Sequence, residues 1–185
     1  MSRLALPLLL ATLLAGCGID AATSAATAAK LKAREAEQAQ AMKHSNALDA
    51  VPLNLQDAQW RSLADYLQPV TLQQGQVLIE QGVKDRTVYF VESGSLTVHY
   101  EDDKDRIRIA MVGAGSLLGE GAFFSHLPRS ATVNAGSACR LWCLTPLRFR
   151  ELSTRFPELA LEMTVAMSAV LARRMYNKPK RVAVT

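Results

Sequence analysis

Two short runs near the middle of the chain carry residue types that bind a phosphate ester. The first contains Gly119 and Glu120, and the second contains Arg129 and Ser130. An arginine side chain can bind two phosphate oxygens at once, and a serine hydroxyl adds a further donor. A glutamate would repel a phosphate, but it accepts a hydrogen bond from a sugar hydroxyl. Together these residues predict a site for a ribose-phosphate ligand.

The backbone around these residues is expected to help hold the anion. Gly119 permits a sharp turn, so that the amides after it converge on one point. A short helix beginning at Gly121 or Ala122 would aim its free N–H groups and the positive end of its dipole at the ligand. The competing interpretation of Arg129 and Glu120 is a structural salt bridge between neighbouring strands. For Ser130 the alternative to a ligand contact is a hydroxyl that belongs to a turn.

Catalytic and metal chemistry find little support in the sequence. The three histidines lie far apart, at His44, His99 and His126, without the paired spacing typical of a metal site. Three cysteines cannot form a disulfide framework. Cys139 and Cys143 would lie about 13 Å apart on one face of a strand, so we expect them to pack in the core. We therefore predict no catalytic residues, no metal and no cofactor.

Composition limits the possible architectures. The chain has 185 residues, of which 49% are hydrophobic and 21% are charged, with a formal charge of +4. That length suits one domain with some excess, and the apolar content excludes a wholly disordered chain. A charge of +4 is too small to predict nucleic-acid binding without a clustered basic patch.

The first residues are typical of an export signal. Arg3 precedes the apolar run Leu4–Leu14, which as a helix spans roughly 16 Å, against about 30 Å for a bilayer core. The following Leu14–Cys17 resembles a bacterial lipobox, which implies a signal peptide over residues 1–16 and a lipid on the Cys17 sulfur. This resemblance implies a lipid-anchored protein on the periplasmic side of the cell envelope, and Gly18 favours the outer membrane.

Two alternatives to a lipoprotein stay open at this stage. The cysteine can be a chance occurrence after a hydrophobic stretch. Translation can also begin downstream, and a start at Met42 would leave the globular part intact and cytoplasmic. Residues 17–50 are rich in Ala, Glu, Lys, Arg and Gln without Pro, and they are predicted to form a helical, solvent-exposed tether. A helix packed against the domain is the alternative.

Residues 51–176 are predicted to form the folded domain. A helix over Leu55–Leu67 should end at Pro69, because apolar residues there follow a 3.6-residue period. Short segments of alternating polarity predict half-buried strands over Thr87–Val91, Leu96–Tyr100, Arg106–Met111 and Cys139–Leu144. Helices return over Leu147–Phe156 and Pro157–Tyr176. Short strands separated by glycine turns favour an antiparallel β-roll or jelly roll flanked by an N-terminal helix and a long C-terminal helix.

The runs Leu118–Phe123 and Pro128–Thr132 resemble the phosphate-binding cassette of cyclic nucleotide-binding domains of the catabolite activator protein and protein kinase A regulatory subunit type. Glu120 and Arg129 stand nine residues apart, as in the kinase-type cassette. The resemblance extends over Val51–Tyr176. It implies a cyclic nucleotide as the ligand, held by Gly119, Glu120, Gly121, Ala122, Arg129, Ser130 and Ala131.

The cassette departs from the family pattern at two positions. Leu118 replaces a phenylalanine, and Gly121 replaces an apolar residue, which should loosen the cassette helix and lower the affinity. Ser130 matches serine in the catabolite activator type, so cAMP is the favoured ligand. The resemblance also implies that the last helix pairs in homodimers and closes over the base. Arg173 and Arg174 of that helix could reach Glu120 or the base, with a solvated surface role as the alternative.

These features predict a non-enzymatic sensor or regulatory module that binds a cyclic nucleotide. Residues 177–185 form a basic tail that is too short for a helix-turn-helix domain, so no nucleic-acid partner is expected. The alternative function is a structural or dimerising domain whose pocket no longer binds. A jelly-roll enzyme such as a cupin would need clustered histidines and carboxylates, which the sequence does not offer.

Overall fold

The computed structural model describes residues 27–34, 37, 40, 51–101 and 107–182. The helices in the folded part are α2 (Asp57–Ala64), α3 (Glu120–Ser125), α4 (Pro146–Arg155) and α5 (Pro157–Val182). The strands are β1 (Gln68–Leu72), β2 (Val77–Ile79), β3 (Val88–Ser93), β4 (Ser95–Glu101), β5 (Ile107–Gly113), β6 (Leu117–Leu118), β7 (Thr132–Ala135) and β8 (Cys139–Leu144).

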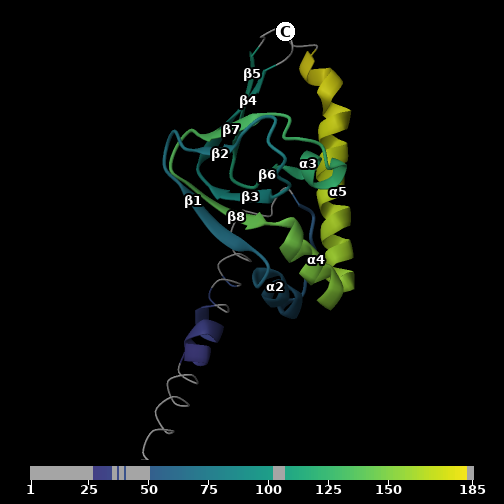
Figure 1. The fold of residues 1–185 in the computed structure, drawn as a ribbon. Coiled ribbons are helices and arrows are strands. Elements are labelled where there is room, and N and C mark those ends of the chain that lie inside the picture. Colours follow the sequence, from purple (N-terminus) through teal and green to yellow (C-terminus); the bar gives the residue numbers. More distant parts are fainter. Residues whose placement is uncertain (1–26, 35–36, 38–39, 41–50, 102–106, 183–185) are drawn as a thin grey trace, which may run out of the picture.

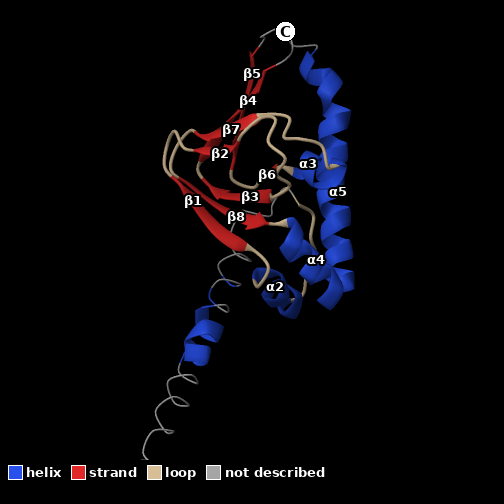
Figure 2. Ribbon diagram, viewed as in Figure 1, coloured by secondary structure: helices blue, strands red, loops and turns tan. Residues whose placement is uncertain are grey.

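The strands form two antiparallel sheets of four strands each. One sheet has the order β1-β8-β3-β6 and the other the order β2-β7-β4-β5. Strands that are neighbours in a sheet are therefore mostly distant in the sequence, as in a roll rather than a simple meander. The helices lie to one side and below the strands, and α5 runs along the whole side of the roll (Figures 1 and 2).

Alternation along the central strands divides the interior into two hydrophobic clusters. Trp142 and Leu144 of β8 face the helices, whereas Cys139 and Leu141 face the second sheet. The first cluster contains buried residues of all four helices, including Met163 and Met167 of α5. The first sheet is thus covered on both faces. The helices, α5 among them, pack on one face of the first sheet, and the second sheet packs on the other face.

The predicted half-buried character is wrong for β8. In this strand Arg140 alone is exposed, because β8 lies between β1 and β3 and both faces of its sheet are covered. The predicted core role of Cys139 and Cys143 agrees with the structure, in which both are buried and unbonded. Burial raises the pKa of the Cys143 thiol.

The predicted helices and strands are present, with shifted ends. The first helix, α2, begins at Asp57 and already ends at Ala64, before Pro69. Pro69 instead lies in β1, where a residue without an N–H is tolerated because β1 is an edge strand. The last helix extends beyond Tyr176 to Val182, so it includes part of the segment predicted to be a basic tail. The fold class predicted from the sequence is confirmed, with mainly antiparallel β-structure and a long C-terminal helix.

Several predictions concern residues outside those described. The signal peptide over residues 1–16 and the lipid site at Cys17 fall there, as does most of the tether. Residues 27–34 are helical and exposed. Within the described ranges, no helix combines the length and the apolarity that a membrane crossing requires. The same ranges hold no cluster of metal-ligating side chains.

Candidate functional site

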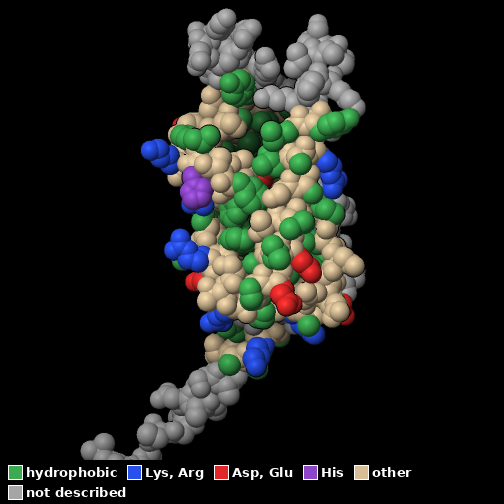
Figure 3. Space-filling view, turned by 90° about the vertical axis from the view of Figure 1, so that its right-hand side faces the viewer, with side chains coloured by type: hydrophobic (Ala, Val, Ile, Leu, Met, Phe, Trp, Pro, Cys, Tyr) green, Lys and Arg blue, Asp and Glu red, His purple; other side chains and the backbone are tan. Residues whose placement is uncertain are grey.

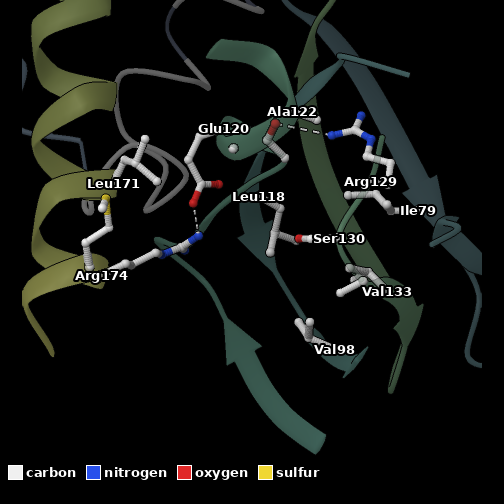
Figure 4. A pocket seen from close by; sticks show the side chains of 14 residues that line it. Ile79, Val98, Leu118, Glu120, Ala122, Arg129, Ser130, Val133, Leu171 and Arg174 are labelled. Carbon is white, nitrogen blue, oxygen red and sulfur yellow. Dashed lines mark hydrogen bonds and ion pairs between the residues drawn. The ribbon is translucent and has the colours of Figure 1, made fainter. Parts of the chain in front are cut away.

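A cavity of about 300 Å³ lies between α3, the second sheet and α5. Fourteen residues line it, and Figure 4 shows their side chains. Its polar side chains are Glu120, Arg129, Ser130 and Arg174, and the remaining lining is glycine, alanine and larger aliphatic residues. The first residue of α3 is Glu120, the segment before β7 supplies Arg129 and Ser130, and α5 supplies Arg174.

Gly119 forms the turn that starts α3, and only glycine suits its position. Its φ of 84° lies in the left-handed region, and it is the N-cap residue of the helix. A Cβ atom built there would lie 2.3 Å from Nη1 of Arg129 and 2.6 Å from the Thr87 carbonyl oxygen. Glycine therefore allows the turn and the close approach of the arginine.

Arg129 is almost completely buried behind this turn, with 3% of its side chain exposed. Nη1 donates to the Gly119 carbonyl at 3.2 Å, and Nη2 donates to the Thr87 carbonyl at 2.6 Å. Nη2 also forms an ion pair with the carboxylate of Asp85. The Nε–H is buried and has no partner in the protein. Arg129 is therefore a fixed cation with a spare donor beside the cavity.

The segment around Arg129 is also held through its backbone. The Arg129 amide donates to Val83 at 2.9 Å, and the Gly82 amide donates to the Arg129 carbonyl at 2.8 Å. These bonds tie the segment to the loop between β2 and β3, which also carries Asp85. Burial alone would raise the pKa of the Asp85 carboxyl, but hydrogen bonds from Arg129 and Thr87 outweigh it and lower that pKa.

Glu120 is the first residue of α3, and its side chain is 8% exposed. Its Oε1 accepts a hydrogen bond from Nη1 of Arg174 at 2.5 Å, shown as a dashed line in Figure 4. Nη2 of Arg174 donates to the Leu117 carbonyl at 2.5 Å. Because Arg174 belongs to α5, this ion pair fastens the last helix to the start of the cassette.

The structure brings all seven predicted binding residues to one cavity. Gly119, Glu120, Gly121, Ala122, Arg129, Ser130 and Ala131 all line it. Glu120 and Arg129 are not paired with each other, contrary to one form of the salt-bridge alternative; each has a separate partner instead. The predicted helix start is wrong, because α3 begins at Glu120 rather than at Gly121 or Ala122.

The two predicted residues of the last helix differ in position. Arg174 reaches Glu120, which is one of the two contacts predicted for these arginines; the other is the base of the ligand. Arg173 is exposed and is not among the residues that line the cavity, which agrees with the surface alternative. The role of these residues in ligand binding stays a prediction.

Asp85 and most of the aliphatic lining were not among the site residues predicted from the sequence. Asp85 and Arg129 are 44 positions apart, and no spacing or motif connects them. Val98, Leu171 and Met175 were predicted only as strand or helix residues, and Ile79 and Val133 lay outside the predicted strands. Alternation could have assigned Val98 and Val133 to one sheet face, but not to a cavity wall.

Residues 69–156 match the family model of the cyclic nucleotide-binding domain. This part of the chain is therefore similar to cyclic nucleotide-binding domains. It contains every predicted cassette residue, whereas α5 follows it in the chain.

Two curated proteins resemble the chain over more than half of its length. A cAMP-dependent protein kinase regulatory subunit of Yarrowia lipolytica is 34% identical over 117 residues, which are 63% of this chain and 30% of that protein. A cAMP-activated global transcriptional regulator CRP of Haemophilus influenzae is 33% identical over 107 residues, 57% of this chain and 46% of that protein. The chain thus spans less than half of either relative.

Solved structures show the same fold. A cyclic nucleotide-binding domain from Methylobacillus flagellatus superposes with a TM-score of 0.70 at 21% identity, covering 75% of this chain and 81% of that one. The catabolite activator protein of Thermus thermophilus superposes with a TM-score of 0.62 at 24% identity, covering 73% and 62%.

Proposed function

We propose that the chain is a non-enzymatic regulatory module that binds a cyclic nucleotide, with cAMP favoured, in the cavity between α3 and α5. The observation that carries this proposal is the state of Arg129. It is a buried cation with an unpartnered Nε–H beside a cavity. A buried donor without a partner costs free energy that an anionic ligand would recover.

The other polar residues suit the rest of such a ligand. Glu120 can accept a hydrogen bond from a ribose hydroxyl, because one of its oxygens remains beside the one that Arg174 occupies. The first-turn amides of α3, among them those of Gly121 and Ala122, lack partners within the helix and can donate to phosphate. Ser130 and the Ala131 amide would add donors from the other side. The names of the relatives, which refer to cAMP, support the choice of ligand.

Binding would act by shifting the position of α5. The helix is attached to the cassette through Arg174 and Glu120, so a ligand that contacts Glu120 also alters the contact that holds α5. Ligand affinity that differs between two arrangements of α5 is sufficient to shift their populations.

Isothermal titration with cAMP tests the proposal. Arg129→Lys should weaken binding by about tenfold or more, since a charge-assisted hydrogen bond contributes about 1.5–3 kcal/mol. Ser130→Ala, at an exposed position, should weaken cAMP binding by about threefold to tenfold.

The matched control is Arg140→Lys, an exposed arginine of β8 outside the cavity, which should leave the affinity for cAMP unchanged. Thermal unfolding without ligand shows whether each variant is folded. Absence of cAMP and cGMP binding by the folded wild-type chain at 1 mM ligand would refute the proposal.

A second candidate is a dimerising domain with a pocket that no longer binds. It is favoured by one observation: Glu120 and Arg129 already have ion-pair partners within the chain. The same titration distinguishes the two candidates, because this one requires no response to nucleotide.

We further propose that the domain forms homodimers through α5 and is anchored by a lipid at Cys17 on the periplasmic side of the envelope. The first part is supported by the exposed apolar side chains of α5, and the second by the lipobox-like sequence alone. Because cyclic nucleotides are made in the cytosol, a start at Met42 is the alternative. Intact mass of the native protein would distinguish a lipidated from a shortened chain.

A further inference from the structure

The cassette helix α3 is too short to be stable by itself. It has six residues, whereas isolated helices shorter than about 12–15 residues are marginal in water. Its second residue is Gly121, which disfavours helix relative to alanine. At its first residue, Glu120, the helix is tied to Arg174 of α5, beside which it lies (Figure 1). The position of α3 must therefore come from contacts with other elements, at its end as well as at its start.

Arg86, a half-buried residue of the loop between β2 and β3, reaches the end of this helix. Its Nη2 donates to the Phe123 carbonyl at 3.3 Å. That carbonyl lacks its usual helical partner, because the Leu127 amide donates to the Ser125 hydroxyl instead, at 3.2 Å. An arginine at a helix C-terminus satisfies such a carbonyl and also opposes the negative end of the helix dipole. Arg86 therefore caps α3 from a segment 37 residues earlier in the chain.

The Arg86 side chain gives up hydration to make this contact. Its Nε is buried and has no hydrogen-bond partner among the described residues. A buried donor without a partner costs free energy, so this guanidinium does not lie as a freely solvated surface arginine would. The preceding residue, Asp85, pairs with Arg129. Two adjacent loop residues thus engage the two parts of the cassette, Asp85 its arginine and Arg86 its helix.

We infer that Arg86 is a positioning residue for the cavity, which holds the last turn of α3 and thereby the orientation of the whole helix. Glu120, Gly121 and Ala122 of that helix line the cavity, whereas Arg86 is not among the lining residues. Arg86 therefore acts through α3, and its contact offsets the weakness that Gly121 gives to the helix. The inference rests on the proposed function for what the cavity binds, but the hold on α3 exists without a ligand.

Hydrogen–deuterium exchange of the ligand-free chain, measured on peptides that cover α3, tests this hold. Arg86→Ala should speed exchange of the α3 amides by about threefold to tenfold, since one hydrogen bond contributes about that factor. Arg86→Lys can still donate to the Phe123 carbonyl, so its effect should be less than threefold. The matched control is Lys84→Ala, which removes a positive charge from an exposed position of the same loop and should also change exchange by less than threefold.

A second substitution separates a hold on α3 from a general effect on the fold. In the Arg86→Ala chain, Gly121→Ala should slow α3 exchange again by about twofold to fivefold, because alanine favours helix and its Cβ would meet nothing within 4 Å. The hold on α3 is overturned if Arg86→Ala changes α3 exchange by less than threefold, if Lys84→Ala matches its effect, or if Gly121→Ala brings no recovery.

Isothermal titration with cAMP tests the consequence for the cavity. Arg86→Ala should weaken binding by at least threefold, because the ligand must then select chains in which α3 is in place. Arg86→Lys and Lys84→Ala should each weaken it by less than threefold. A smaller loss of affinity in Arg86→Ala overturns the positioning role while leaving the proposed function intact. If the wild-type chain binds neither cAMP nor cGMP, the proposed function fails, and the exchange measurement still decides whether Arg86 holds α3.

Discussion

At the scale of single residues, the site depends on how two arginines are held. Arg129 is buried and has three partners behind the cavity, whereas Arg174 is about one-third exposed and bonds across the cavity. The first arrangement fixes a cation before any ligand arrives, which lowers the cost of ordering it on binding. The second joins two elements through a contact that solvent can reach. The two arginines are therefore suited to different tasks, Arg129 to affinity and Arg174 to coupling.

Asp85 should stabilise the fold in a pH-dependent way through Arg129. Its pKa is lowered in the folded state, so its contribution is present above the unfolded pKa of about 4 and is lost as the pH falls through the folded pKa. At pH 7, Asp85→Asn should lower the free energy of unfolding by about 1 kcal/mol, because the carboxylate is 42% exposed and solvent screens the pair. Urea unfolding at pH 7 and pH 3 measures the change.

The pH dependence separates this ion pair from a general charge effect. Near pH 3 the difference between wild type and Asp85→Asn should shrink, since the wild-type carboxyl is then increasingly protonated. The control is Glu92→Gln, which removes the partner of the exposed Arg140 at 3.6 Å and should cost less than about 0.5 kcal/mol. An Asp85→Asn effect that is the same at both pH values would contradict this role.

At the scale of elements, the cassette helix is built on two glycines with opposite tolerance. Gly119 has a positive φ and is tightly surrounded, whereas a Cβ at Gly121 would have nothing within 4 Å. Gly119→Ala should destabilise the domain by about 2 kcal/mol or more, from backbone strain and collision with Arg129. Gly121→Ala should stabilise it by about 0.5 kcal/mol, because alanine favours helix. Chemical denaturation of both variants measures the contrast, and equal destabilisation by the two would disprove it.

Features that are local in the chain could be predicted from the sequence, whereas contacts between distant segments could not. Alternation and glycine turns predicted four of the eight described strands, β3, β4, β5 and β8, because that pattern is local in the chain. The cassette was predicted from the resemblance of two short runs around Glu120 and Arg129 to the family pattern. The partner of Arg129 could not be found, since Asp85 is brought to it only by the pairing of two distant segments. Burial of both faces of β8 was missed for the same reason. Its position between β1 and β3, and the helices over its sheet, are long-range facts.

At the scale of the whole molecule, α5 joins the cavity to a second surface. Its inner face packs on the first sheet through Met163, Met167 and Val170. Five exposed residues on its outer face follow one another at intervals of four, three, four and three positions, and we call this row the seam. The residues of the seam are Leu161, Val165, Ser168, Ala172 and Met175. This heptad-like spacing is typical of helices that pair. Hydrophobic side chains gather along the side of the molecule to which α5 belongs (Figure 3).

The seam predicts a dimer whose loss leaves each chain folded. Leu161 and Val165 are 65% and 61% exposed in the single chain, so Val165→Glu should spare the core. It should raise the dimer dissociation constant by at least tenfold, because it places two like charges in a helix interface. Leu147→Glu, at a leucine of α4 that is 64% exposed, is the matched control and should leave the dimer unchanged. Sedimentation equilibrium measures both, and a wild-type chain that stays monomeric at 100 μM would exclude pairing through α5.

Met175 belongs to both the seam and the cavity wall. Saturating cAMP should therefore alter the dimer constant of the wild type, since a ligand that repositions Met175 acts on both surfaces at once.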